Sequence, residues 1–372
     1  MAGRVLAVSP SGVFGGAERI LADLAADMPA LGWEYDVLLL QDGDLGLELE
    51  RRGVRTTVLD AGRMRDPRAF LRSARAIRRR LVDYDVIISN LGKAHVYVAA
   101  AAWGKRHPPL LWWQGGIPAP PGHMDRAVSR LPAAAVLTMS GAAQAAQSQM
   151  ARTPPTHLVY PGTDTSVFSP TGTPVDLVGR RPGDVVIGLA GRIQPWKGQD
   201  LFLEAAARAV QTSAASLRFV VVGGVEERDR AYANSLHVRA EEPDLRGRVT
   251  FVGHRTDMPA VLRGLDVVVN ASRPEPFGLA VTEAMACGRT VLAYNQGGPG
   301  EIVQHAISGW LLDLDGPDAL ATAIVHLASD EGLRAALGRA GRSRVLKDFS
   351  TQATAQRLAV VLEALTTHAR EG

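Results

Sequence analysis

The sequence lacks several features that would assign it to a whole class of proteins. It has one cysteine, Cys287, in 372 residues, so no disulfide framework or cysteine metal site can form within the chain, and a reducing compartment is expected. No apolar run approaches 18 residues, so no segment is expected to span a membrane. The first residues, MAGRVLAVSPSG, lack the apolar core and cleavage site of a secretory signal. Together these absences predict a cytoplasmic protein.

An excess of one charge is also missing, and so are metal-binding patterns. The 41 Lys and Arg residues exceed the 38 Asp and Glu residues by too little to indicate a nucleic-acid partner. No HExxH motif, pair of histidines or DxD-like acidic cluster in the sequence suggests a metal site. We therefore expect neither a metal ion nor another cofactor.

What the sequence does have is a repeated alternation of short apolar runs and longer helical stretches. A chain of 372 residues exceeds what one core usually organises, which favours two domains. Apolar strands that alternate with helices indicate parallel sheets covered on both faces. The predicted strands are residues 4–8, 35–40, 54–59, 86–88, 110–113, 135–138 and 158–160, then 185–190, 218–222, 249–252, 266–270, 290–293 and 310–312.

A stretch rich in Pro, Gly, Ser and Thr, residues 166–184, interrupts this alternation and predicts a linker. The predicted fold is α/β, with two doubly wound Rossmann-like domains, residues 1–170 and 171–350, facing a central cleft. A last helix, near residues 351–366, either caps the second domain or crosses back to the first. The pattern alone leaves that choice open.

The first candidate site is SGVFGGAER, residues 11–19, directly after the first predicted strand. Gly15 and Gly16 open a helix there, and the free N–H groups of a helix start can face an anion. The spacing differs from the GxGxxG dinucleotide fingerprint. A plain strand-to-helix turn is the structural alternative.

The second candidate is AGRIQPWKGQD, residues 190–200, after the first strand of the second domain. Arg192 and Lys197 lie just before a helix that begins near Gly198. Two cations at a helix start beyond a parallel strand are the parts of a phosphate clamp. Ordinary surface charges are the alternative, and the position at the strand end favours the clamp.

The third candidate is RPEPFGLAVTEAMACG, residues 273–288, where Glu275 and Glu283 flank a turn with few polar side chains. Pro276 suits the first turn of a helix, so residues Phe277, Gly278 and Leu279 are expected to carry unpaired N–H groups that favour an anion. Glycosidase carboxyl pairs lie about 5 to 9.5 Å apart, whereas eight helical residues span roughly 12 Å. The spacing thus favours one long ligand held at two points. A charge on the helix dipole and a surface carboxylate are the alternatives.

Other polar residues give weaker signals. His95 begins a helix after residues 86–88, Gln114 follows two tryptophans and could hydrogen-bond a sugar hydroxyl, and His254 ends a strand where the backbone could contact a base. Each has a purely structural alternative. A basic stretch could contact an anionic membrane surface, although we favour a solvated helix face; its arginines are Arg63, Arg65, Arg68, Arg72, Arg75, Arg78, Arg79 and Arg80.

The ordered motifs resemble those of a known family. G-R-x(4)-K-G at residues 191–198 and E-P-F-G-L-x(3)-E-A-M-A-C-G at residues 275–288 are similar to motifs of the retaining nucleotide-sugar glycosyltransferases of family 4, which have the GT-B fold. G-G-A-E at residues 15–18 and P-G-T-D-x(3)-F-x-P at residues 161–170 match the family's patterns too. The resemblance therefore spans nearly the whole chain.

The resemblance implies roles for the candidate residues and a catalytic set of Glu275, Arg192, Lys197 and Gln114. The cations would neutralise the donor diphosphate, and no metal would be needed because they and the helix end take the leaving-group charge. Helix 351–372 would cross back to the first domain. The implied donor-binding residues are Gly15, Gly16, Arg192, Lys197, His254, Glu275 (sugar hydroxyls), Phe277, Gly278, Leu279 and Glu283 (ribose); the acceptor-side residues are His95 and Gln114.

One departure from the family pattern concerns Gln114. Many relatives carry a histidine after the fifth strand of the first domain, and this sequence has glutamine there. Glutamine donates and accepts hydrogen bonds but does not titrate near pH 7, which puts an acid–base role in doubt and leaves hydroxyl recognition open.

The expected activity is transfer of a sugar, with retention, from an NDP-sugar to a hydroxyl of a small soluble acceptor such as a cyclitol or a natural-product sugar. UDP is the expected nucleotide, as in UDP-GlcNAc or UDP-glucose. Three alternatives stay open: a lipid-linked glycan acceptor with peripheral membrane contact, a nucleotide-sugar epimerase, and a non-catalytic sugar-nucleotide sensor.

Overall fold

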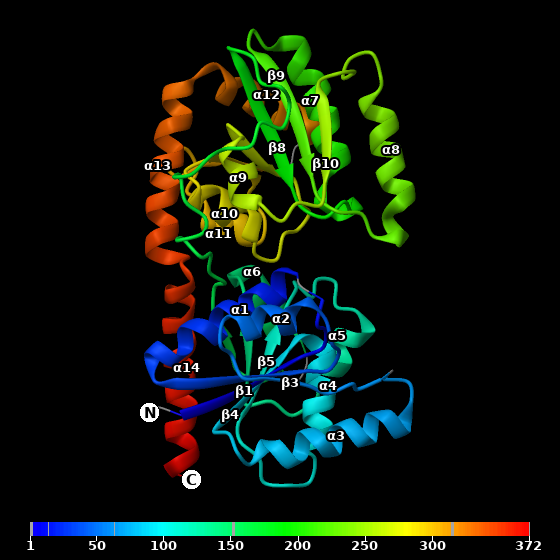
Figure 1. The fold of residues 1–372 in the computed structure, drawn as a ribbon, viewed down its shortest axis with the longest axis vertical. Coiled ribbons are helices and arrows are strands. Elements are labelled where there is room, and N and C mark those ends of the chain that lie inside the picture. The colour runs from blue at the N-terminus through cyan, green and yellow to red at the C-terminus, as the bar shows by residue number, and fades with distance from the viewer. Residues whose placement is uncertain (1–2, 14, 63, 151–152, 314–315, 372) are drawn as a thin grey trace. The chain divides into compact units, whose positions relative to one another are not determined.

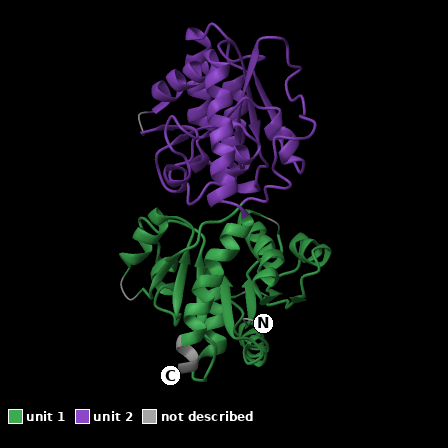
Figure 2. Cartoon of the chain, turned by 90° about the vertical axis from the view of Figure 1, so that its left-hand side faces the viewer, with its two compact units in different colours: residues 1–162, 351–372 green, residues 163–350 purple. Residues whose placement is uncertain are grey.

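The computed structural model describes residues 3–371, apart from residues 14, 63, 151–152 and 314–315. The chain divides into two compact units (Figure 2). Unit 1 comprises Met1–Gly162 and Thr351–Gly372, and unit 2 comprises Thr163–Ser350. Each unit has a parallel sheet with helices around it (Figure 1).

Unit 1 is built on a seven-stranded sheet in the order β3-β2-β1-β4-β5-β6-β7. Its strands are β1 (Gly3–Ser9), β2 (Trp33–Leu39), β3 (Thr56–Val58), β4 (Val86–Asn90), β5 (Leu110–Gln114), β6 (Ala135–Thr138) and β7 (Thr156–Leu158). Its helices are α1 (Gly16–Asp27), η1 (Met28–Leu31), α2 (Asp44–Arg51), α3 (Pro67–Leu81), α4 (Leu91–Ala102), α5 (His123–Val128), α6 (Gly141–Ser148) and α14 (Thr351–Glu371).

Unit 2 repeats this architecture with six strands in the order β10-β9-β8-β11-β12-β13. The strands are β8 (Asp184–Ala190), β9 (Ser216–Val222), β10 (Val249–Gly253), β11 (Val267–Asn270), β12 (Thr290–Tyr294) and β13 (Trp310–Leu312). The helices are η2 (Pro195–Lys197), α7 (Gln199–Thr212), η3 (Glu227–Asp229), α8 (Arg230–Ala240), α9 (Met258–Arg263), α10 (Leu279–Ala286), α11 (Gly298–Ile302), α12 (Gly316–Ser329) and α13 (Glu331–Asp348).

The central strands are buried on both faces because nearly every residue in them is apolar. All residues of β8 and β11 are buried, as are nearly all of β1, and all strand pairs in both sheets are parallel. Helices on both faces cover such strands. The predicted α/β class with two doubly wound parallel sheets is confirmed.

The division between the units lies at Gly162/Thr163, eight residues before the predicted boundary. Residues 163–183, most of which had been predicted as a linker, are attached to unit 2. Thr163 Oγ1 lies 2.6 Å from Thr282 Oγ1 on α10, and Arg263 Nη1 donates to Ser169 O at 3.2 Å. These polar contacts hold an irregular segment that has no periodicity for a sequence pattern to detect.

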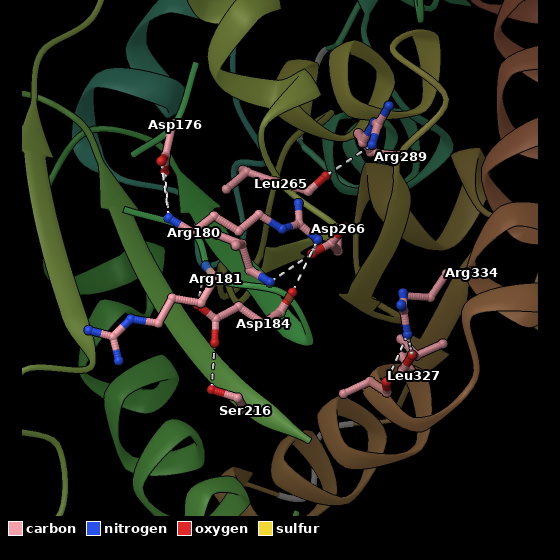
Figure 3. A network of polar contacts seen from close by, with 12 residues as sticks. Asp176, Arg180, Arg181, Asp184, Ser216, Leu265, Asp266, Arg289, Leu327 and Arg334 are labelled. Atoms are coloured by element: carbon pink, nitrogen blue, oxygen red, sulfur yellow. Dashed lines mark hydrogen bonds and ion pairs between the residues drawn. The ribbon is translucent and has the colours of Figure 1, made fainter. Parts of the chain in front are cut away.

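The same segment ends in a polar network at the amino edge of the unit 2 sheet (Figure 3). Arg180 donates to Asp266 Oδ2 at 2.8 Å, and the backbone N–H of Val186 donates to the same oxygen. Ser216 Oγ donates to Asp184 Oδ1 at 2.6 Å, and this hydrogen bond holds the pKa of the Asp184 carboxyl below its usual value. The network fixes the start of β8, and therefore the position of the loop at its other end.

α14 is the last helix of the chain and belongs to unit 1, where it packs against α1 and η1. Thr354 Oγ1 donates to the carbonyl of Tyr160 at 2.9 Å, and the Arg357 guanidinium lies 5.5 Å from the centre of the Tyr160 ring. Thr354 and Tyr160, 194 positions apart in the sequence, are thereby joined within one unit.

Candidate functional site

The candidate residues of unit 2 gather where its strand order reverses. β8 lies between β9 on one side and β11 on the other, so the loops after β8 and β11 leave the carboxyl edge side by side. Ligands of doubly wound sheets bind at this switch point. Arg192 and Lys197 follow β8, and Glu275 follows β11.

An ion pair joins these two loops. Lys197 Nζ lies 2.5 Å from Glu275 Oε2, and the two side chains are 18% and 9% exposed. The ammonium also lies 4.0 Å from the centre of the Trp196 ring, a cation–π contact. A lysine and a glutamate 78 positions apart thus form one nearly buried pair at the end of the sheet.

The two loops can approach because glycine occupies position 198. Gly198 has φ 73°, and a Cβ there would lie 2.3 Å from the carbonyl oxygen of Ala271. The backbone N–H of Arg273 donates to the Trp196 carbonyl at 2.9 Å. A side chain at position 198 would separate Lys197 from Glu275.

The carboxylate of Glu275 has a second polar neighbour. Asn270, the last residue of β11, directs its Nδ2 to the same Glu275 Oε2 at 3.4 Å, and its Oδ1 accepts from the N–H of Ser272. Asn270 is 8% exposed and Glu275 is 6% exposed. The glutamate is held between an amide and an ammonium, so its orientation is set before any ligand binds.

α10 begins at Leu279, later than Pro276 had suggested. Gly278, in a left-handed conformation (φ 103°), is its N-cap and provides no side-chain cap. The difference arises because a helix does not continue through a left-handed residue. The first N–H groups of a helix have no partner within it, so an uncapped start is a place for an anionic ligand.

The turn before α10 is fixed by the loop after β12. The N–H of Gly298 donates to the Glu275 carbonyl at 2.9 Å, and Phe277 is 3% exposed. A Cβ on Gly298 would lie 2.0 Å from the Phe277 carbonyl oxygen. Phe277 therefore supports the turn with its ring, and only its backbone is suited to meet a ligand.

Glu283 lies one turn into α10 and is 7% exposed. Thr282, beside it, hydrogen-bonds Thr163 and donates to the Leu279 carbonyl at 3.0 Å. These contacts anchor the helix whose start forms the candidate anion site. The helix ends as expected, since Gly288 follows with φ 69°.

Arg192 and His254 lie on the β9 side of the same edge. Arg192 Nη1 pairs with Glu226 Oε1 at 2.7 Å, with side chains 63% and 43% exposed. His254 is exposed and packs near Gly224, whose Cβ would lie 3.5 Å from the His254 Cβ. Because exposed pairs contribute little free energy, the Arg192 guanidinium can exchange Glu226 for a ligand at small cost.

In unit 1, the predicted residues also lie at the carboxyl edge. Gly15 is the N-cap of α1, which starts at Gly16 directly after the β1 loop, and β1 is the strand where the order of this sheet reverses. Gln114 is the last residue of β5 and is 7% exposed. Gly15 is exposed, whereas Gln114 offers only a small surface for contact with a ligand.

His95 requires a correction, because it has no exposed surface. Its Nδ1 lies 2.8 Å from Ser89 Oγ, which donates to the Leu111 carbonyl, so Nδ1 carries the hydrogen. Its ring stacks on Trp112 at 5.5 Å, and burial lowers its pKa to about 4. A neutral core histidine does not contact an acceptor, and the assignment to the acceptor side is withdrawn.

Three supporting residues were missed by sequence reasoning: Trp196, Asn270 and Gly298. The signal available for Asn270 was a polar residue at the end of an apolar strand. The signal for Gly298 was the run Gly297-Gly298-Pro299-Gly300 in the loop after β12. Trp196 was noted only as a spacer. Each acts by positioning Lys197, Glu275 or Phe277.

Neither metal-binding clusters nor membrane-spanning helices occur in the part of the chain that the structure describes. No group of three or more His, Cys, Asp and Glu side chains is arranged to hold a metal ion there. No helix in the described ranges is both long and apolar enough to cross a membrane.

Known structures with similar folds cover both units. HepE from Anabaena, in complex with UDP and glucose, superposes with a TM-score of 0.84 at 27% identity, over 97% of this chain and 100% of that one. Sucrose-phosphate synthase from Thermosynechococcus elongatus superposes with a TM-score of 0.79 at 22% identity, over 98% and 100% of the two chains. The second likeness concerns the fold alone.

Curated relatives by sequence include the D-inositol 3-phosphate glycosyltransferase of Rhodococcus opacus (strain B4), 35% identical over 206 residues, which are 54% of this chain and 46% of the relative. That of Mycobacterium ulcerans (strain Agy99) is 34% identical over 206 residues, 54% and 43% of the two chains. The chain thus spans about half the length of the curated relatives it matches.

Two family models match successive parts of the sequence. The model described as Glycosyltransferase Family 4 matches residues 14–167, and the model described as Glycosyl transferases group 1 matches residues 178–344. Both units are therefore accounted for by one family, as the motifs predicted. The chain belongs to the group 1 glycosyltransferases of family 4 and has the GT-B fold.

Proposed function

We propose that this protein transfers a sugar from a UDP-sugar to a hydroxyl of a small soluble acceptor, with retention of the anomeric configuration and without a metal ion. The observation that carries the proposal is the Lys197–Glu275 pair at the uncapped start of α10. One cation, one carboxylate and a row of backbone N–H groups stand together at the switch point of the unit 2 sheet.

The donor diphosphate is the anion proposed to bind at Lys197 and the start of α10. Lys197 contributes a full positive charge, Arg192 can leave its exposed partner Glu226, and the α10 start adds N–H donors. In a nearly buried setting such charges stabilise a departing diphosphate strongly. Glu275, already oriented by Asn270, accepts hydrogen bonds from sugar hydroxyls, and Glu283 accepts them from the ribose.

In the proposed reaction, the bond between the sugar C1 and the diphosphate oxygen breaks on the face where the acceptor oxygen attacks. The acceptor proton passes to the departing phosphate oxygen, and the new bond joins C1 to the acceptor oxygen. No side chain is asked to form a covalent intermediate. Lys197 and Arg192 take the charge that develops on the diphosphate.

UDP is the favoured nucleotide because HepE, similar over its whole chain, was crystallised with UDP and glucose. A cyclitol is the favoured acceptor because the curated relatives act on D-inositol 3-phosphate. Gln114, at the carboxyl edge of the unit 1 sheet, is the residue proposed to recognise an acceptor or donor hydroxyl.

The experiment is a thermal-shift comparison of UDP-, GDP- and ADP-sugars, followed by acceptor trials with the nucleotide that stabilises the protein. We expect UDP and a UDP-hexose to raise Tm, and NMR of the product to show the donor's anomeric configuration. Stabilisation by GDP or ADP alone would replace the nucleotide assignment. An inverted product would refute the retaining mechanism.

The matched variants are Glu275→Gln and Glu226→Gln, which each remove one carboxylate charge at the same edge of the sheet. We expect Glu275→Gln to abolish transfer in a folded protein, as should Lys197→Ala. Glu226→Gln should transfer at least as fast as the native chain, because it frees Arg192. Full turnover by Glu275→Gln would reject the assignment.

The two other functions differ in what they release. An epimerase would produce free nucleotide without any acceptor, and a sensor would bind a UDP-sugar without consuming it. Incubating the protein with the stabilising UDP-sugar, with and without acceptor, and measuring free UDP separates all three. Acceptor-dependent UDP release is the result expected for a transferase.

A further inference from the structure

The solvent face of α3 carries a continuous stripe of cations. Its exposed positions follow the helical spacing i, i+3, i+4, i+7, i+11 and i+14, so they share one side of the helix. We call them the α3 stripe: Arg68, Leu71, Arg72, Arg75, Arg79 and the adjoining Val82. Figure 1 shows α3 along the outside of unit 1, beside α4. Arg63, predicted to belong to this basic stretch, lies outside the described residues.

The four arginines of the α3 stripe are unpaired. Within the described part of the chain, none of their guanidinium groups has an ion-pair or hydrogen-bond partner. Asp66 caps the start of the helix with its own carboxylate, through the N–H groups of Arg68 and Ala69. Four exposed cations on one helix face repel one another. If this face only met water, the arrangement would therefore not stabilise the helix.

Apolar side chains are exposed on α3 and just after α4. Leu71 is 51% exposed and Val82 is 77% exposed, and both lie within the α3 stripe. Trp103, just after α4, is 71% exposed and is followed by Lys105 and Arg106. Large exposed apolar groups beside cations are the composition of a surface that meets a lipid interface.

Arg78 joins the Trp103 loop to α3. Its Nε donates to the Ala101 carbonyl at 2.6 Å, and its Nη2 donates to the Trp103 carbonyl at 2.9 Å. This side chain therefore satisfies the last carbonyls of α4. It holds the backbone of Trp103 beside the C-terminal half of α3.

The charge of the chain is unevenly distributed. Residues 65–109 contain ten Lys and Arg residues and three Asp residues, a net charge of +7, whereas the whole chain carries +3. The rest of the chain is therefore net negative. The positive excess belongs to α3, α4 and the loops beside them. The small net charge of the whole chain does not reveal this local excess.

We propose that the α3 stripe, with Trp103, docks unit 1 on an anionic lipid bilayer. The arginines would lie at the headgroup phosphates, and Leu71, Val82 and Trp103 would enter the boundary of the acyl chains. Docking is reversible and peripheral. It is independent of the acceptor, so its test does not depend on the proposed transferase activity.

A nucleic acid would match the arginines and could stack on Trp103, but it would not match the exposed aliphatic groups of this surface. Nucleic-acid phosphates bind cations, and bases stack on aromatic rings. Exposed aliphatic groups such as Leu71 and Val82 contribute little to binding a nucleic acid. Insertion into a bilayer removes those aliphatic groups from water. The apolar members of the stripe therefore favour lipid.

The first test is co-sedimentation of the full chain with vesicles of phosphatidylcholine alone and with phosphatidylglycerol added. We expect binding to the anionic vesicles only. Each arginine near such a surface adds about fivefold in affinity, so replacing the four stripe arginines by glutamine should weaken binding at least about a hundredfold. The control replaces four exposed arginines outside residues 65–109, namely Arg51, Arg181, Arg230 and Arg246.

The control variant has the same net charge as the stripe variant and should bind like the native chain. Equal losses in the two variants would mean that only overall charge matters and would overturn the proposal, as would equal binding to both kinds of vesicle. Leu71→Ser must also weaken vesicle binding. If it does not, while an RNA competes with the vesicles for the same arginines, the surface is a nucleic-acid site and the lipid proposal fails.

Trp103 gives a second measurement that does not rely on substitution of charges. On anionic vesicles its fluorescence should shift to shorter wavelength and be quenched by brominated acyl chains, because the indole leaves water. Trp103→Phe should lose that change and keep most of the binding. An unchanged spectrum in the native chain at saturating vesicles would show that no side chain enters the bilayer and would refute the docking geometry.

Discussion

Replacing Lys197 by methionine and Glu275 by glutamine, singly and together, tests whether the pair is one energetic unit. Methionine keeps the unbranched stem beside Trp196, and glutamine keeps the shape of glutamate. The Nζ–Oε2 distance of 2.5 Å gives a gross attraction of about 7 kcal/mol at an effective dielectric constant near 20. Most of it offsets the loss of hydration of two nearly buried charges.

The net effects follow from what each variant leaves behind. Lys197→Met leaves Glu275, 6% exposed, without its cation, so we expect a loss of about 3 kcal/mol in the free energy of unfolding of unit 2. Glu275→Gln leaves the Lys197 ammonium in contact with the Trp196 ring, so we expect a smaller loss in the free energy of unfolding, about 2 kcal/mol. The double variant should lose about 3 kcal/mol, because the second change removes an interaction that is already gone.

The assay is urea unfolding of the four proteins, with calorimetry to follow the transition of unit 2. A loss of 3 kcal/mol corresponds to a fall in Tm of about 6–12 °C for a unit of this size. Lys347→Ala, which removes an exposed lysine from α13, should stay within about 0.5 kcal/mol of the native chain. Additive losses, near 5 kcal/mol in the double variant, would show that the two residues do not act as a unit.

Three further predictions concern other parts of the chain. The pKa of His95 is about 4 in the folded state against 6.5 when unfolded, so the unfolded state takes up a proton first as the pH falls. The free energy of unfolding should then drop by up to about 3 kcal/mol between pH 6.5 and pH 4, and His95→Phe should abolish that drop in urea titrations; an unchanged slope would contradict it. Gly298→Ala should displace Phe277 and lower UDP affinity at least about tenfold by calorimetry, whereas Gly247→Ala, at φ 71° with nothing within 4 Å, should leave UDP affinity unchanged. Cys287 is fully buried and burial raises the pKa of its thiol to about 11, so a thiol reagent should modify one cysteine per chain only after denaturation; rapid modification of the native protein would contradict the burial.

The strands were the most predictable part of the fold. Each of the 13 predicted apolar runs overlaps one of the strands β1 to β13, although residues 158–160 share only Leu158 with β7. The central strands agree best, because a parallel strand buried on both faces needs an unbroken apolar sequence. Prediction was poorer where polar contacts decide the structure. Residues 163–183 have no periodicity, and single hydrogen bonds such as Thr163–Thr282 attach them to unit 2.

His95 shows why exposure was hard to predict from sequence. The residue follows a strand at the carboxyl edge, where ligands bind, and the sequence contains no sign that Trp112 will stack on it. Its partner Ser89 lies six positions earlier and is itself buried. A histidine held in the core by one hydroxyl and one ring has the same local sequence as a histidine at the rim of a binding site.

Pairing of Lys197 with Glu275 depends on a fact that no local pattern contains, namely which strands are neighbours. The loops after β8 and β11 meet only because β11 pairs directly with β8, while β9 and β10 lie on the other side. Arg192, five residues before Lys197, faces that other side and pairs with Glu226 instead. The sequence predicted both cations for one diphosphate, whereas the structure gives them different carboxylate partners from different strands. A diphosphate that binds both cations must therefore break the exposed Arg192–Glu226 pair, which costs little free energy. It must also share Lys197 with Glu275, and that pair supplies the oriented glutamate for the sugar.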